Sequence, residues 1–220
     1  MRYKYIFFDL DGTITEPALG ITNGIIYALD KFGIEVTDRT SLYKFIGPPL
    51  RDSFREFYGF TEEEVERAVA LYREYYSDKG IIENEIMPGI EETLTSLHNA
   101  GCKLYVATSK PEIYAKKILE HIGLGSCFDI VAGSQLDGSR DNKELVLRYL
   151  LETSGINGTD AISSTVMVGD RKFDIEGAKA VGIDHIGVTF GYGDRLELET
   201  AGALKIVDTA KELTEYILEF

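Results

Sequence analysis

Short β-rich segments alternate with amphipathic helical segments over most of the 220-residue chain. The strand candidates are nearly continuous apolar runs, which is the pattern of strands that helices cover on both faces. Strands that alternate with helices favour a parallel sheet, because each parallel connection needs a crossover. We therefore expect an α/β fold with a parallel sheet and helices on both faces. The expected strands are residues 3–9, 103–108, 128–132, 165–168, 185–189 and 205–207, and the expected helices of this part are residues 89–100, 111–122, 142–154, 174–180 and 210–219.

One long stretch breaks the alternation. Residues 16–82 contain no convincing strand, but they contain helical patterns at residues 22–32, 41–45, 50–58 and 61–77. Thr61 followed by Glu64 predicts a capping box at the start of the last pattern. Because connections in such sheets are normally short, we interpret residues 16–82 as a small all-helical cap domain. The rest, residues 1–15 and 83–220, would form a Rossmann-like core, and the cap would act as a lid.

The composition disfavours several classes of protein. Hydrophobic residues make up 44% of the chain, enough for a sizeable core, and no apolar run is long enough to span a membrane. The amino terminus lacks the apolar region of a secretory signal. Cys102 and Cys127 form neither a disulfide framework nor a metal motif, which fits a cytoplasmic protein. The formal net charge of −14 disfavours nucleic acid and anionic membranes as partners.

The strongest candidate site follows the first expected strand, in the sequence Phe-Phe-Asp-Leu-Asp-Gly-Thr at residues 7–13. Asp9 and Asp11 are two residues apart, so their side chains can point to the same side. Gly12 permits a tight turn that leaves backbone N–H groups free to face an anion. Open α/β sheets bind ligands outside the carboxyl ends of their strands. A ligand site is thus favoured over a turn with incidental aspartates.

A second strand runs into acidic residues in Val-Gly-Asp-Arg-Lys-Phe-Asp at residues 168–174. Asp170 stands at the strand end, and Asp174 begins the next helical run. Oxygen ligands of this kind suit Mg²⁺, which takes one or two carboxylates and keeps several waters. For Asp174 alone, a helix-start carboxylate that favours the helix dipole is a plausible alternative.

Two weaker signals lie at other strand and helix ends. Thr108, Ser109 and Lys110 end a strand before a helix, where hydroxyl and N–H groups can bind an anion, although Ser and Thr also commonly cap helices. Lys143 begins a helical run, against the dipole preference, which suggests a use other than that of a solvated lysine. All four segments lie where an α/β sheet binds its ligands.

Together these segments resemble the motifs of the haloacid dehalogenase superfamily, and the resemblance covers the whole chain. Residues 9–13 resemble the first motif and residues 169–174 the fourth. Thr108 matches the second motif and Lys143 the third. The helical insert resembles the cap of the phosphoglycolate-phosphatase-like branch.

The sequence departs from the family pattern at two positions. Ser109 stands where the second motif often has Asn, and Glu144 stands where proline often follows the third-motif lysine. These departures leave Lys110 as an alternative to Lys143 for the phosphate-binding lysine.

The resemblance implies a Mg²⁺-dependent phosphatase for a small phosphorylated metabolite such as phosphoglycolate, a nucleoside 5′-monophosphate or a sugar phosphate. It implies that Asp9 is the nucleophile that becomes an aspartyl-phosphate. Asp11 would be the acid and then the base. The implied metal ligands are Asp9, the backbone carbonyl of Asp11, and Asp170, with support from Asp174. The implied phosphate-binding groups are Thr108, Ser109, Lys143 and backbone N–H groups near Asp11 and Gly12.

Substrate choice is expected to lie in the cap. Residues 44–55 carry three cations around a Gly-Pro-Pro turn and resemble the family's specificity region. We predict that Arg51 or Lys44 faces the leaving group, and a solvated basic helix face is the alternative.

Two other functions remain open. A phosphosugar mutase resembles the same motifs, although Thr13 leans toward hydrolysis. A non-catalytic binding or regulatory protein is disfavoured by the complete set of motif residues. Hydrolytic dehalogenation is disfavoured because a halide leaves without the proton that Asp11 would supply. We expect a monomer or a homodimer.

Overall fold

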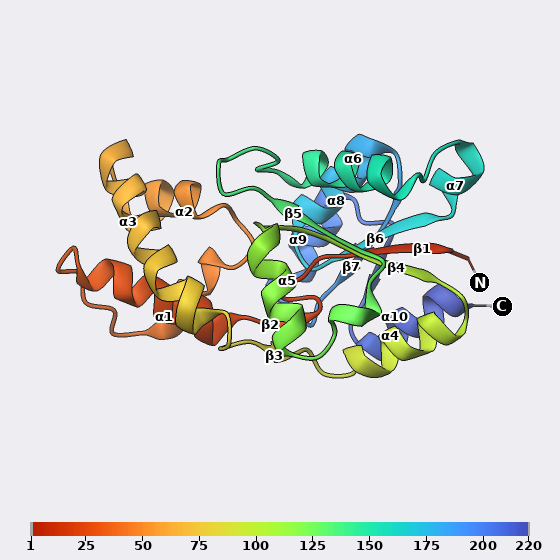
Figure 1. Cartoon of the computed structure of the whole chain (residues 1–220), viewed down its shortest axis with the longest axis horizontal. Helices are drawn as coiled ribbons and strands as arrows, with labels where there is room; N and C mark the ends of the chain where they lie inside the picture. The colour runs from red at the N-terminus through yellow and green to blue at the C-terminus, as the bar shows by residue number, and fades with distance from the viewer. Residues whose placement is uncertain (1, 220) are drawn as a thin grey trace.

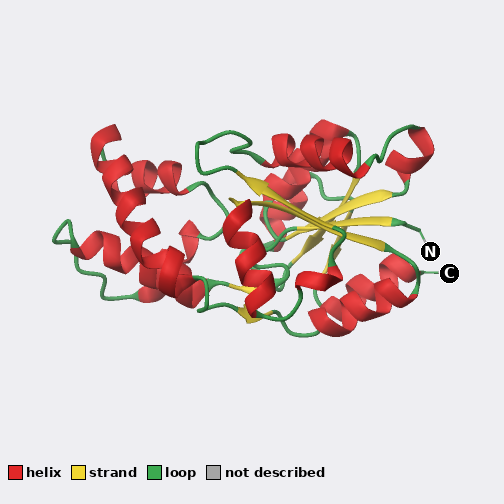
Figure 2. Ribbon diagram, viewed as in Figure 1, coloured by secondary structure: helices red, strands yellow, loops and turns green. Residues whose placement is uncertain are grey.

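The computed structural model describes residues 2–219, and its centre is a six-stranded parallel sheet (Figures 1 and 2). The strand order is β5-β4-β1-β6-β7-β8. The α/β fold expected from the alternating pattern is therefore confirmed, and all six expected strands are present. Their bounds are β1 Tyr5–Phe8, β4 Lys103–Pro111, β5 Ile130–Ser134, β6 Thr165–Gly169, β7 Asp184–Val188 and β8 Lys205–Val207.

Helices cover both faces of the sheet. Successive strand residues point to opposite faces, so the residues on both faces are buried. Ile6 and Phe8 belong to one buried cluster and Phe7 to another. The first cluster packs against α4 (Ile90–Asn99), α5 (Glu112–His121) and α10 (Ala210–Leu218). The second packs against α6 (Lys143–Ser154) and α8 (Lys172–Val181). This explains why the strands are apolar without alternation.

The strand register decides which loops meet. Phe8 at the end of β1 pairs with Val106 of β4 on one side and with Val168 of β6 on the other. Asp9, Thr108 and Asp170, which stand one or two residues further along, therefore come out at the same edge. The central position of β1 thus brings together motifs that are about 60 to 160 residues apart in the sequence.

The helical insert lies beyond the carboxyl ends of the strands (Figure 1). It consists of α1 (Ala18–Asp30), the 3₁₀ helix η1 (Arg39–Phe45), α2 (Leu50–Tyr58), α3 (Glu62–Tyr75) and the π-helical turn η2 (Tyr76–Gly80). The predicted capping box is present: Thr61 Oγ1 accepts from the Glu64 N–H, and the Glu64 carboxylate accepts from the Thr61 N–H. That residues 16–82 form a separate domain remains a proposal.

A two-stranded antiparallel ribbon closes the base of the insert. It pairs Thr15 with Ile86 and Glu16 with Glu85, in β2 (Thr15–Glu16) and β3 (Glu85–Ile86). The expectation of no strand within residues 16–82 is wrong by one residue, since Glu16 belongs to this ribbon. Two-residue strands paired across about 70 residues leave no local pattern in a sequence.

Three short helices were also not expected: η3 (Gly125–Cys127), α7 (Thr159–Ser163) and α9 (Arg195–Ala201). They span at most two turns and have too few residues for a recognisable apolar period. Within residues 2–219, every helix is too short or too polar to cross a lipid bilayer.

Candidate active site

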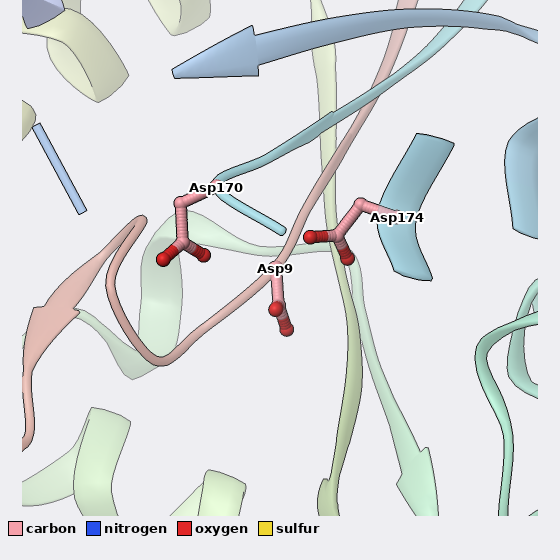
Figure 3. A group of neighbouring side chains, drawn as sticks. All are labelled: Asp9, Asp170 and Asp174. Carbon is pink, nitrogen blue, oxygen red and sulfur yellow. The ribbon is translucent and has the colours of Figure 1, made fainter. Parts of the chain in front are cut away.

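Three buried aspartates surround one space at the carboxyl edge of the sheet (Figure 3). Asp9 follows β1, Asp170 follows β6, and Asp174 lies in the first turn of α8. One carboxylate oxygen from each lies within 4.8 Å of the other two. The residues are 7%, 0% and 0% exposed, respectively. Three ionised carboxylates this close and this buried repel one another strongly, so the cluster requires positive charge.

Lys143 supplies part of that charge. Its Nζ lies 2.9 Å from Asp9 Oδ1 and 2.7 Å from Asp174 Oδ1, and it donates to the backbone carbonyl of Ala107 at 2.8 Å. The side chain is 3% exposed, which excludes a solvated lysine. These three contacts match the three donors of an ammonium group. Lys143 therefore neutralises and orients the acids, and keeps no spare donor for a phosphoryl group.

Asp170 has no salt bridge among residues 2–219. Its Oδ1 accepts from Thr13 Oγ1 at 3.3 Å, and its Oδ2 accepts from the Tyr192 N–H at 2.7 Å. Burial, and then the neighbouring Asp174 and Asp9, raise the pKa of Asp170 well above its usual range. A buried carboxylate without a cation, beside two more carboxylates, is an oxygen donor set that fits Mg²⁺.

Asp174 has two structural roles. Its carboxylate accepts from the Arg171 N–H at 3.1 Å, so it is the helix-start carboxylate of the alternative interpretation, and it is also a member of the acidic cluster. Burial raises its pKa to about 6, against the opposing effect of Lys143. Gly169 makes the approach possible, because a Cβ there would lie 2.1 Å from Asp174 Cγ.

Gly12 leaves room for the Asp170 side chain, and its N–H is not free for the predicted anion contact. Its φ is +79°, and a Cβ on it would lie 2.3 Å from Asp170 Oδ2. Its N–H, which was expected to face a phosphate, donates to the carbonyl of Thr15 at 2.8 Å. The tight turn therefore uses this N–H internally, and the glycine lets the turn approach Asp170.

Asp11 is held by the second lysine of the site. Lys110 Nζ lies 2.9 Å from Asp11 Oδ2 and donates to Tyr76 Oη at 2.6 Å. Asp11 Oδ1 is buried and has no hydrogen-bond partner in the described part of the chain. Burial raises the pKa of Asp11, and Lys110 opposes the shift. A carboxyl group that retains its proton more readily than usual, with one oxygen unbonded, is suited to general acid chemistry.

A cavity of about 690 Å³ opens beside Asp9 and Asp11. Thr108, Ser109 and Lys110 line it from the core, as the second candidate motif predicts. The helical insert, Tyr114 of α5 and the loop after β5 line most of the remainder. Thr108 is 2% exposed, and its Oγ1 accepts from the Lys110 N–H at 3.2 Å.

The two cations predicted to choose the substrate lie in different places. Arg51 lines the cavity, but Glu66 holds its guanidinium through two hydrogen bonds of 2.5 and 3.0 Å. Lys44 is exposed, and its ammonium lies 4.4 Å from the centroid of the Phe57 ring. Glu66 therefore takes two of the five N–H donors of Arg51, and Lys44 is not among the residues that line the cavity.

Three residues of the site were not anticipated. Tyr192 supports Asp170 from a Gly-Tyr-Gly segment between a strand and a helix, and that strand-end position was a usable signal. Tyr76 and Arg73 line the cavity from the insert. Neither residue belongs to a sequence motif. Only the packing of α3 and η2 shows which of their residues face the core.

The matched family model agrees with this geometry. Residues 6–188 match the model described as haloacid dehalogenase-like hydrolase. A crystal structure of a predicted phosphatase from Clostridium acetobutylicum has a TM-score of 0.94 and 46% identity, and the alignment covers all of both chains.

Two curated relatives have different names. A 5′-nucleotidase from Pseudomonas aeruginosa is 43% identical, over 90% of this chain and 88% of its own length. Tyrosine-protein kinase PtkA from Mycobacterium tuberculosis is 37% identical, over 96% of this chain and 72% of its own length. The predicted superfamily resemblance is thus confirmed at the level of sequence and fold.

Proposed function

The chain belongs to the haloacid dehalogenase-like hydrolase family, and we propose that it is a Mg²⁺-dependent phosphatase that hydrolyses a small phosphomonoester through an aspartyl-phosphate intermediate. The main support is the pair Asp9 and Asp11. Asp9 is a carboxylate of the acidic cluster, Asp11 has a buried Oδ1 without a hydrogen-bond partner, and both residues line the same cavity.

Asp9 is the proposed nucleophile. Its Oδ1 accepts from the Leu10 N–H at 2.7 Å and from Lys143 at 2.9 Å. Its Oδ2 has no donor among residues 2–219, so Oδ2 is the oxygen available to attack phosphorus. The attack would form the Asp9 oxygen–phosphorus bond and break the bond to the leaving oxygen.

Asp11 is the proposed acid and base. It gives its proton to the leaving oxygen and then takes a proton from the water that hydrolyses the aspartyl-phosphate. Lys110 holds one oxygen of Asp11 in place during both steps.

Asp9, Asp170 and the backbone carbonyl of Asp11 would hold Mg²⁺, with Asp174 in support. When bound, the ion would reduce the repulsion between the attacking carboxylate and the phosphate. The hydroxyls of Thr108 and Ser109 are the proposed donors to the phosphoryl oxygens, and Lys143 orients Asp9. The proposed lid is the insert, residues 16–82, over a core of residues 1–15 and 83–220.

Nucleoside 5′-monophosphates are the first substrates to test, because the relative at 43% identity is named a 5′-nucleotidase. Phosphoglycolate and sugar phosphates complete the panel. Phosphate release is measured with Mg²⁺ present, and Asp9→Asn serves as the inactive control.

The products distinguish the alternatives. Glucose 6-phosphate from glucose 1-phosphate would indicate a mutase, and labelled tyrosine peptide from ATP would indicate a kinase. If the wild-type protein releases phosphate from no member of the panel, the proposed function is wrong.

A further inference from the structure

Three cations line the cavity, and two of them are already bound within the protein. Lys110 contacts Asp11 and Tyr76, and Arg51 is held by Glu66. The third, Arg73, makes no salt bridge or hydrogen bond within residues 2–219. Its guanidinium therefore presents a planar set of free donors to whatever fills the cavity.

Arg73 lies further from the reacting group than Tyr76. Val69, Tyr72, Arg73 and Tyr76 follow one another at helical spacing, and all four line the cavity. Tyr76 reaches Lys110, and Lys110 reaches Asp11. Tyr76 follows Arg73 by three helical positions, a rise of roughly 4.5 Å along the axis. A leaving group that starts at Asp11 therefore passes Tyr76 before it meets Arg73.

Aromatic rings line this path. Tyr72 and Tyr76 stack with ring centroids 5.1 Å apart and planes 14° from parallel, and Tyr114 lies 6.0 Å from Tyr76. These largely buried rings give the path an apolar wall, which is complementary to a partly apolar group. The volume of about 690 Å³ far exceeds what a two-carbon acid needs and suits a ligand of nucleotide size.

The charges at the cavity mouth disfavour a leaving group with a second negative charge. Asp137 and Asp141 of the loop after β5 line the mouth and are exposed. They repel an added carboxylate or phosphate, but they can accept hydrogen bonds from sugar hydroxyls. A neutral nucleoside with hydrogen-bond acceptors on its base meets both conditions.

We propose that Arg73 is a specificity-determining residue that selects 6-oxopurine nucleoside 5′-monophosphates, a proposal that rests on the phosphatase function above. The guanidinium donates to two acceptors at once, and guanine and hypoxanthine present N7 and O6 as such a pair. Adenine presents N7 beside an amino donor, which opposes a guanidinium that can only donate.

The test compares kcat/KM for GMP, IMP, AMP and phosphoglycolate with Mg²⁺ present. The wild-type protein should favour GMP and IMP over AMP by about 10- to 100-fold. Arg73→Met keeps an unbranched side chain without donors, and it should bring the GMP-to-AMP ratio close to one. Arg67→Met is the matched control on the same helix, because the Arg67 guanidinium stacks on Phe32 instead, 4.7 Å from its ring centroid. It should keep both the rates and the ratio.

Several results would overturn the proposal. The proposal is wrong if the wild-type kcat/KM values for GMP and AMP are equal, or if Arg73→Met leaves the GMP-to-AMP ratio unchanged. It is also wrong if the wild-type protein prefers phosphoglycolate and Arg73→Met removes that preference. The last would assign Arg73 to a carboxylate.

Calorimetric titration of GMP and AMP into Asp9→Asn gives an independent measurement. A GMP preference there without wild-type turnover would support Arg73 while refuting the phosphatase. Equal affinities would overturn the role of Arg73, even if Arg73→Met does not fold.

Discussion

Tyr76 of the helical insert accepts a hydrogen bond of 2.6 Å from Lys110 of the core, and the same Lys110 ammonium lies 2.9 Å from the carboxylate of Asp11. Tyr76 is 1% exposed, and its ring lies so close to Gly80 that a Cβ there would come within 2.4 Å of it. The insert therefore reaches the proposed acid through a single buried lysine.

Tyr76→Phe removes the hydroxyl and keeps the ring. Lys110 then loses one partner, and its hold on Asp11 becomes less well defined. We expect kcat for a nucleoside monophosphate to fall about 2- to 10-fold, since one hydrogen bond contributes about 0.5–1.5 kcal/mol. p-Nitrophenyl phosphate should be affected less, because its leaving group needs little protonation.

Tyr75→Phe is the matched control, since Tyr75 donates to Glu83 instead. A fall of equal size for both substrates would show that Tyr76 acts only on the fold.

Asp9→Asn should remove phosphate release without loss of stability. The amide is a poor nucleophile, and the exchange removes one charge from a cluster of three carboxylates within 4.8 Å of one another. Turnover is measured by phosphate release and stability by thermal unfolding without Mg²⁺. Residual activity above about one tenth of wild type, equivalent to roughly 1.4 kcal/mol of barrier, would exclude Asp9 as the nucleophile.

The sheet and most of the acidic site could be predicted from the sequence, because both depend on local patterns. Apolar runs that end in Asp9 and Asp170 show where strands stop, and the carboxyl ends of parallel strands share one edge. The role of Lys143 could be predicted from the sequence only in part. Its position at a helix start suggested a use other than that of a solvated lysine, but its partners Asp9 and Asp174 depend on how α6 packs beside α8.

The cap side of the site could not be predicted in the same way. Arg51 and Arg73 are both arginines on helices of the insert, and a sequence does not show which of them already has a carboxylate partner. Glu66, 15 residues after Arg51, holds Arg51 across two helices, and this contact leaves Arg73 available. The ribbon of Thr15 and Ile86 was missed for the same reason, since its pairing is long-range.

Mg²⁺ should stabilise the protein as well as activate it. The ion would offset the mutual repulsion of Asp9, Asp170 and Asp174, and a ligand that binds only the folded state raises the melting temperature as its concentration rises. Thermal unfolding over a Mg²⁺ titration should show this rise, and a chelator should remove both the rise and the phosphate release.

Asp170→Asn should lose most of the Mg²⁺-dependent rise in melting temperature and remain folded. If wild type and Asp170→Asn respond equally to Mg²⁺, the ion binds elsewhere.

Lys143→Met should be the most destabilising of these substitutions. The ammonium is 3% exposed and contacts two buried carboxylates, so its removal leaves Asp9 and Asp174 without their cation. Loss of one partner of a buried ion pair costs about 3–5 kcal/mol. Urea unfolding measures the loss, and Lys211→Met, whose side chain is 85% exposed, should unfold close to wild type. Adding Asp174→Asn to Lys143→Met removes one of the uncompensated charges and should restore part of the stability. If the double variant is no more stable than Lys143→Met, the lysine stabilises the fold by packing and not by charge.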